Sequence, residues 1–150
     1  NLGGPYAVSI SHMRSSLQVP CNTPPWGVRV GVNLADGTTA WKHRNGTVAG
    51  QKVAGIQFPI PFEMGMLAHG GTLTTAGGVA FTGAALDDII RAYDMQTGKT
   101  LWQHKLPAGG QATPMTYRGK DDKQYVVIAA GGHGSLGTTA GDSVIAYRLD

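Results

Sequence analysis

An eleven-residue segment that occurs twice is the feature that most limits how this chain can fold. Residues 31–41 and 92–102 align without a gap. Each reads small residue, apolar or aromatic residue, Asn or Asp, a turn pair ending in Gly, and a final Trp. The offset is 61 residues (102 minus 41), and a further copy begins at Ala146. Periods of about 40 to 60 residues with one Trp in each copy are typical of the blades of a β-propeller.

Strand-forming sequences surround both copies. Segments rich in β-branched and aromatic residues are bounded by Gly or Asp, and Gly98 suits a hairpin turn because it tolerates a positive φ. No ten-residue stretch follows the 3.6-residue period of an amphipathic helix. We therefore predict an all-β chain, with blade-like units at about residues 4–45, 66–106 and 111–150.

Size and composition set limits on the whole molecule. The 150 residues include 23 Gly and 8 Pro, which indicates many short strands joined by turns. Propellers close with about 4 to 8 blades, so we expect this chain to be a fragment of a larger propeller. The net charge of +3 comes from scattered residues without a basic stripe, which argues against a nucleic-acid partner. The sequence contains no run of about 18 apolar residues, so we predict no membrane-spanning helix in this chain.

The longer loops are expected at one end of the sheets. In an up-and-down meander, alternate connections lie at the same end, and this rule groups residues 12–26, 44–70, 87–88, 107–111 and 131–134 together. The opposite end receives short polar turns such as residues 118–123. Because binding residues concentrate on loops that a rigid scaffold positions, we expect function at the long-loop end.

Within that end, Gly131, Gly132 and His133 give the sharpest indication of a site. The glycines let backbone approach a flat ligand closely, and an imidazole can donate a hydrogen bond or move a proton. The alternative is a tight turn with an exposed histidine. Asp87 could bind a sugar hydroxyl, a cation or a partner, and its alternative is a solvated turn. The histidines lack metal-ligand spacing, so we assign no metal site in this chain.

Two aromatic features have alternative interpretations. Trp41 and Trp102 could stack on an aromatic ligand, but their equal spacing favours packing between blades. Residues 58–62 (Phe-Pro-Ile-Pro-Phe) could form a lid, a lipid-facing patch or a loop anchored in a groove.

These residues resemble a known family. The repeat is similar to the tryptophan-docking motif of pyrroloquinoline-quinone (PQQ) dependent dehydrogenases. Residues 106–117, 124–128 and 131–135 resemble the carboxyl-terminal end of the membrane-bound glucose dehydrogenases and of the similar quinate/shikimate dehydrogenases. The resemblance runs from about residue 4 to residue 149, and it implies a fragment of an eight-bladed β-propeller.

The resemblance also implies an activity. Such enzymes oxidise a sugar or polyol hydroxyl by hydride transfer to PQQ, beside Ca²⁺ or Mg²⁺, and pass the electrons to ubiquinone. An amino-terminal segment anchors them in the bacterial inner membrane, with the propeller on the periplasmic face. The family's catalytic base and the expected cation ligands belong to earlier blades. The resemblance therefore places no catalytic residue in this chain and implies that the fragment alone is inactive.

Individual residues of this sequence match functional positions of the family. His133 matches the family's active-site histidine near cofactor and substrate, in a loop where Gly131 and Gly132 would contact the cofactor. Asp87 matches an acidic position associated with substrate. Departures at residues 15–20, 118–123 and 137–142 leave glucose, quinate, shikimate or another polyol open as substrate.

Another class of protein remains an alternative. A non-catalytic propeller scaffold for protein assembly would keep the tryptophan packing. It would have no need of the Gly-Gly-His-Gly loop or of long loops at one end, so we favour the enzyme.

Overall fold

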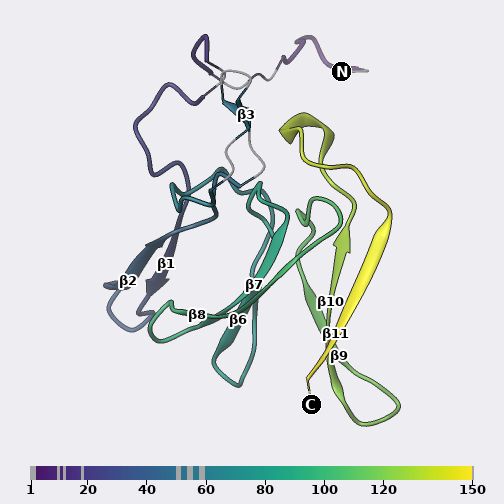
Figure 1. Ribbon diagram of the computed structural model, residues 1–150. Coiled ribbons are helices and arrows are strands. Elements are labelled where there is room, and N and C mark those ends of the chain that lie inside the picture. The colour runs from purple at the N-terminus through teal and green to yellow at the C-terminus, as the bar shows by residue number, and fades with distance from the viewer. Residues whose placement is uncertain are drawn as a thin grey trace.

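The computed structural model describes residues 3–9, 11, 13–17, 19–49, 52–53, 56–57 and 60–149. In these residues it contains antiparallel β-sheets and one short 3₁₀ helix, η1 (Gly134–Leu136). This confirms the predicted all-β fold (Figure 1). Phe58 and Pro59 of the segment considered as a lid lie outside the described residues.

Three sheets form the body of the molecule and lie in chain order in Figure 1. The first sheet pairs β1 (Val28–Val32) with β2 (Thr39–Arg44). The second has the order β5 (Leu73–Thr74), β6 (Val79–Thr82), β7 (Ile89–Asp94) and β8 (Thr100–Lys105). The third has the order β11 (Ser143–Leu149), β10 (Gln124–Ala130) and β9 (Met115–Arg118). A small hairpin joins β3 (Lys52–Val53) to β4 (Ile56–Gln57).

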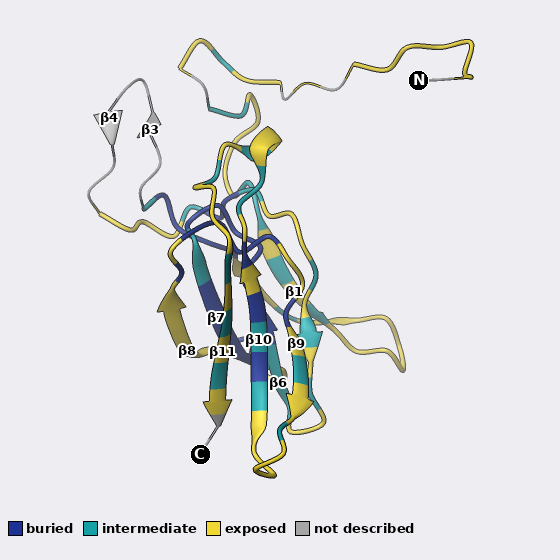
Figure 2. Cartoon of the chain, turned by 90° about the vertical axis from the view of Figure 1, so that its right-hand side faces the viewer, coloured by how far each residue is buried: buried dark blue, intermediate teal, exposed yellow. Residues whose placement is uncertain are grey.

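The core lies between the second and third sheets. Ile90 of β7 is fully buried and belongs to one cluster with Ile128 and Ala130 of β10. Phe81 and Val126 belong to a second cluster between the same sheets. Figure 2 shows buried stretches on β7 and β10, where the sheets face each other. Alternating apolar side chains on facing strands thus hold the sheets together, as in a propeller.

Both copies of the repeat form the same hairpin. The Gly37 amide donates to the Asn33 carbonyl at 2.8 Å, and the Gly98 amide donates to the Asp94 carbonyl at 2.8 Å. Each hairpin shifts register by one residue just before its turn, between residues 31 and 32 and between residues 92 and 93. The repeat therefore specifies the turn and the bulge as one local unit.

The repeat tryptophans reach from one sheet to the next. The Trp41 Nε1–H donates to the Met95 carbonyl of the second sheet at 2.9 Å. Trp102 meets Tyr147 of the third sheet edge to face, with ring centroids 4.9 Å apart. The prediction that these side chains pack between units is confirmed.

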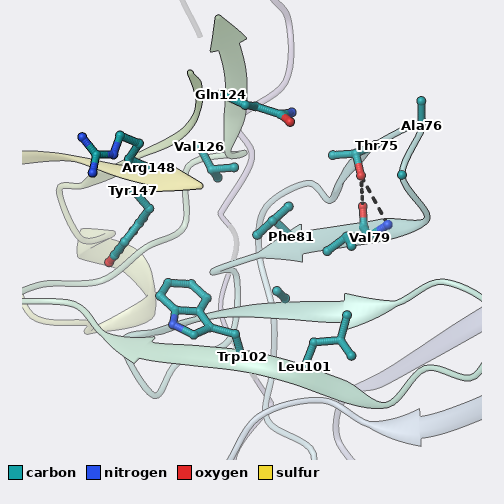
Figure 3. Close-up of a pocket in the computed structure, with 12 residues that line it drawn as sticks. Thr75, Ala76, Val79, Phe81, Leu101, Trp102, Gln124, Val126, Tyr147 and Arg148 are labelled. Atoms are coloured by element: carbon teal, nitrogen blue, oxygen red, sulfur yellow. Dashed lines mark hydrogen bonds between the residues drawn. The ribbon is translucent and has the colours of Figure 1, made fainter. Parts of the chain in front are cut away.

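A hollow of about 680 Å³ lies between the second and third sheets. Apolar side chains line most of it, among them Phe81, Trp102 and Val126, with Gln124 and Arg148 also on its wall (Figure 3). The turn at residues 75–77 borders it, so this hollow lies at the short-turn end.

Candidate functional site

Long loops from all three sheets gather at one end, above the strands in Figure 1. The Gly132 amide donates to the Gly109 carbonyl at 2.9 Å, and the Gly109 amide donates to the Thr139 carbonyl at 2.9 Å. Loop 107–113 is therefore bonded to both arms of loop 131–142. In the part of the chain that the structure describes, the one helix is η1, and its three residues are too few to span a bilayer.

His133 is held by its own loop. Its backbone amide donates to the Thr138 hydroxyl at 2.8 Å, and its Nδ1 lies 3.0 Å from the Ser135 hydroxyl. The Thr138 hydroxyl donates in turn to Gln111 Oε1 at 3.0 Å. When the Ser135 hydroxyl donates to Nδ1, the ring proton of a neutral imidazole sits on Nε2 and remains available to a ligand.

A second histidine, His69, lies beside His133. The ring centroids are 5.0 Å apart, and the planes are tilted by 30°. The His69 amide donates to the Ala84 carbonyl at 3.0 Å, which fixes its loop against the second sheet. The meander rule placed the loops of both histidines at the same end, but no motif singled out His69, so the sequence predicted no role for it.

Asp87 is enclosed by protein groups and is 1% exposed. Both of its carboxylate oxygens accept hydrogen bonds from the Arg91 guanidinium. Oδ2 also accepts from the Thr47 amide at 2.8 Å and from its hydroxyl at 3.0 Å. The carboxylate thus ties the first long loop to β7, while its role in substrate binding stays a prediction.

The buried pair also affects Arg91. Burial of Arg91 acts to lower its pKa, but the hydrogen bond and negative charge of Asp87 outweigh this effect and raise the pKa above its ordinary value. Arg91 therefore remains charged, as a buried guanidinium paired with a carboxylate should. The pair was missed from the sequence, because the two residues lie four apart across a turn and the start of β7.

Asp88 and Lys105 form a second, more exposed pair. Lys105 Nζ lies 3.6 Å from Asp88 Oδ2 and donates to the Asp87 carbonyl oxygen at 2.7 Å. The Thr139 hydroxyl donates to Asp88 Oδ2 at 3.2 Å, which links loop 84–88 to loop 131–142. Both acids of loop 84–88 therefore have a cationic partner within the protein.

The glycines of the histidine loop have different surroundings. Gly132 has φ of +73°, and a Cβ there would lie 2.3 Å from the Thr139 carbonyl oxygen. Glycine is thus required at this position by the loop's own packing. A Cβ on Gly131 would meet only the Gly141 carbonyl oxygen, at 3.7 Å. Contact of Gly131 and Gly132 with a cofactor stays a prediction.

The described residues contain no cluster of three or more His, Cys, Asp or Glu side chains able to hold a metal ion. What the loops present are hydrogen-bond donors: two imidazoles with the Ser135 hydroxyl beside them. Such groups suit an oxygen-rich or anionic ligand.

Antiparallel sheets docked through repeated tryptophans, with long loops at one end, define this chain as a segment of a β-propeller. The family model for the PQQ-type glucose/ethanol/alcohol dehydrogenase β-propeller domain matches residues 1–126. The chain belongs to this family.

Similar proteins agree with this membership. The chain is 48% identical over 147 residues to quinoprotein glucose dehydrogenase A of Acinetobacter calcoaceticus, covering 98% of this chain and 18% of that protein. It is 43% identical over 148 residues to a probable quinate dehydrogenase (quinone) of Xanthomonas campestris pv. juglandis, covering 98% of this chain and 19% of the relative. The chain thus spans about a fifth of the length of these curated relatives.

Among solved structures, a quinohemoprotein alcohol dehydrogenase of Pseudomonas putida HK5 matches with a TM-score of 0.58 and 28% identity. The match covers 81% of this chain and 16% of that one. This likeness supports the propeller fold.

Proposed function

We propose that this chain forms part of a PQQ-dependent dehydrogenase that oxidises a hydroxyl group of a sugar or polyol. The observation that carries the proposal is the position of His133. Its imidazole lies where the long loops meet, in a chain that belongs to a PQQ dehydrogenase family. Glucose and quinate are the substrate candidates, because relatives named for each are 48% and 43% identical to the chain.

The donors at the long-loop end fit the cofactor. PQQ is a planar quinone that carries carboxylates, and the His133 imidazole, held through Nδ1 by Ser135, can offer an N–H group to such an oxygen. The bound quinone would supply the hydride acceptor. His133 would contact cofactor or substrate through Nε2, with Ser135 and Thr138 fixing its orientation.

Asp87 would support the site indirectly, and other catalytic groups would lie outside this chain. We propose that Asp87 contributes to the substrate site mainly by holding Thr47 and Arg91 in place, since its carboxylate is buried against both. The catalytic base and the ligands of Ca²⁺ or Mg²⁺ would lie outside this chain, and the chain alone would be inactive. Transfer of electrons to ubiquinone and a periplasmic position at the bacterial inner membrane complete the proposal.

The test is reconstitution of the full-length protein with PQQ and with Ca²⁺ or Mg²⁺. Dye reduction is followed with glucose and with quinate in parallel. Turnover of either substrate is the expected result. We expect His133→Ala to lower kcat/KM by about 10- to 100-fold, as loss of one hydrogen bond to a charged or reacting group would.

A matched control is His43→Ala, because His43 lies in β2 and its Nε2 contacts the Thr97 carbonyl at 3.0 Å, away from the long loops. This variant should retain most of the activity. If folded protein neither bound PQQ nor turned over any substrate, the enzyme proposal would fail and the assembly scaffold would be favoured.

A further inference from the structure

The pairing of His69 with His133 places two imidazoles at the solvent border of the long-loop end. Their centroids are 5.0 Å apart; His69 is exposed and His133 is half-buried. Within the described part of the chain, the His69 ring makes no hydrogen bond, and His133 uses Nδ1 toward Ser135. In its neutral form each ring therefore has an N–H that no described protein group accepts.

The charges near the pair do not oppose an anion. Asp87 is paired with Arg91, and Asp88 lies beside Lys105. Asp142, the acid in the arm of loop 131–142 that returns to β11, is exposed, so solvent screens its charge. Asp88 Oδ1 is buried and accepts no hydrogen bond from the described residues, but Oδ2 of the same carboxylate lies 3.6 Å from Lys105 Nζ. An anion between the imidazoles would therefore meet two N–H donors, and each acid of loop 84–88 has a cationic partner.

We propose that His69 and His133 together bind a carboxylate group of the substrate, so that the enzyme prefers hydroxy acids to neutral sugars. This inference rests on the proposed function and adds the substrate class to it. Two N–H donors on adjacent rings can each engage one carboxylate oxygen. A hydrogen bond to an ionised acceptor is about twice as strong as one between neutral groups, which gives the acid its advantage over a sugar hydroxyl.

Sequence identity does not by itself choose between the substrates, because relatives named for glucose and for quinate are both close to the chain. Quinate is a carboxylate-bearing polyol and glucose is uncharged, so the two form a matched pair of probes. His69 becomes the specificity-determining residue of this site, acting with His133.

The experiment measures kcat and KM for quinate and glucose with the PQQ-loaded, full-length protein and its His69→Leu and His69→Asn variants. We expect His69→Leu to raise KM for quinate by about 10- to 100-fold, the loss of a charge-assisted hydrogen bond. The glucose constants should change less than about threefold. His69→Asn, which keeps an N–H donor, should recover part of the quinate affinity. His43→Leu is the control for a histidine outside the loops and should leave the substrate ratio unchanged.

A binding measurement separates this inference from the proposed function. Quinate should raise the thermal unfolding midpoint of the wild-type protein and raise it much less in His69→Leu, since a ligand stabilises the state that binds it. Turnover of glucose without turnover or binding of quinate would overturn the inference and leave the proposed function intact. Equal losses for both substrates in His69→Leu would also overturn it, by assigning His69 a structural role. If the folded protein neither binds PQQ nor turns over any substrate, the proposed function fails, and the quinate-induced shift still decides whether the pair binds a carboxylate.

Discussion

The two copies of the eleven-residue repeat share their local structure and differ in their surroundings. Both hairpins close with the same amide-to-carbonyl bond and carry the same bulge. In the strands that lead into the copies, however, Val30 before the first copy is 43% exposed, whereas Arg91, 61 positions later, is 5% exposed. The repeat therefore sets the turn and the direction of the tryptophan, while burial depends on the strands that surround each copy.

The copies also differ in how their turns are stabilised. In the second copy, Asp94 Oδ1 accepts bonds from the Thr97 amide and hydroxyl. The Oδ1 atoms of Asn33 and Asp94 each accept from the amide two residues on, but in the first copy the Thr38 amide and hydroxyl donate to Asp36 Oδ1 instead. One backbone path is thus compatible with two sets of side-chain contacts.

The largest expected effect comes from breaking the buried Asp87–Arg91 ion pair, which lies just before the second copy. Arg91→Ala leaves the Asp87 carboxylate buried without its cation, which should cost about 3–5 kcal/mol. The measurement is chemical denaturation of the full-length protein and its variant. Val30→Ala, at the matching position just before the first copy, should cost much less because Val30 is partly exposed.

The double variant Arg91→Met with Asp87→Asn tests the physical reason. It removes both charges, so it should lose less stability than Arg91→Ala. Equal losses in the single and double variants would contradict the ion-pair explanation.

The second largest expected effect is the difference in stability between alanine substitutions at the two turn glycines. Gly37 and Gly98 have φ of +73° and +70°, so alanine is strained at both. A Cβ on Gly37 would meet nothing within 4 Å, but one on Gly98 would lie 2.5 Å from both Trp41 Cε3 and His43 Cδ2. We expect Gly98→Ala to cost about 1–3 kcal/mol more than Gly37→Ala, because it overpacks the contact with the first sheet.

Thermal or chemical denaturation of both variants measures this difference, with Gly37→Ala as the control for backbone strain. Equal destabilisation would contradict the overpacking explanation, because it would mean that the Trp41 side chain can shift without a free-energy penalty.

The smallest expected effect is a pH dependence that belongs to Asp94. Hydrogen bonds from the Thr97 hydroxyl, and then from the Thr97 amide, lower the pKa of Asp94 in the folded protein. A lowered folded pKa means that the stabilisation is present above the unfolded value of about 3.9 and is lost as pH falls through the folded value. Asp94→Asn should therefore lower stability most near neutral pH, and the difference from wild type should shrink in acid.

Denaturation curves between neutral and acid pH check this sign. Thr97→Val, which removes the hydroxyl, should weaken the same pH dependence. Parallel curves for wild type and Asp94→Asn across the acid range would rule out the proposed contribution.

Much of the fold could be predicted because its determinants are local. Alternating β-branched residues gave the strands, Gly98 gave a turn, and the equal spacing of Trp41 and Trp102 gave the packing between units. The match of the PQQ propeller family confirms the family resemblance.

The site could be predicted only in part, because its contacts join distant segments. His133 stood out through its glycines, but His69 lies 64 residues earlier (133 minus 69) in a loop without a motif. The enclosure of Asp87 depends on Thr47, which comes from the first long loop. No local period or spacing encodes such meetings, since they arise from the stacking of the sheets.

Each repeat tryptophan contacts the sheet that follows its own, and this direction determines how far a substitution should affect stability. Trp41 contacts the sheet after its own, and Trp102 does the same one sheet later, so each contact is head-to-tail and joins unlike surfaces. Head-to-tail contacts can be repeated around a closed ring with one kind of interface. Stability in such an array is nearly a sum of terms from each unit and each adjacent interface. A substitution at one tryptophan should therefore destabilise the interface between two neighbouring sheets. The loops of the other sheets should keep their positions.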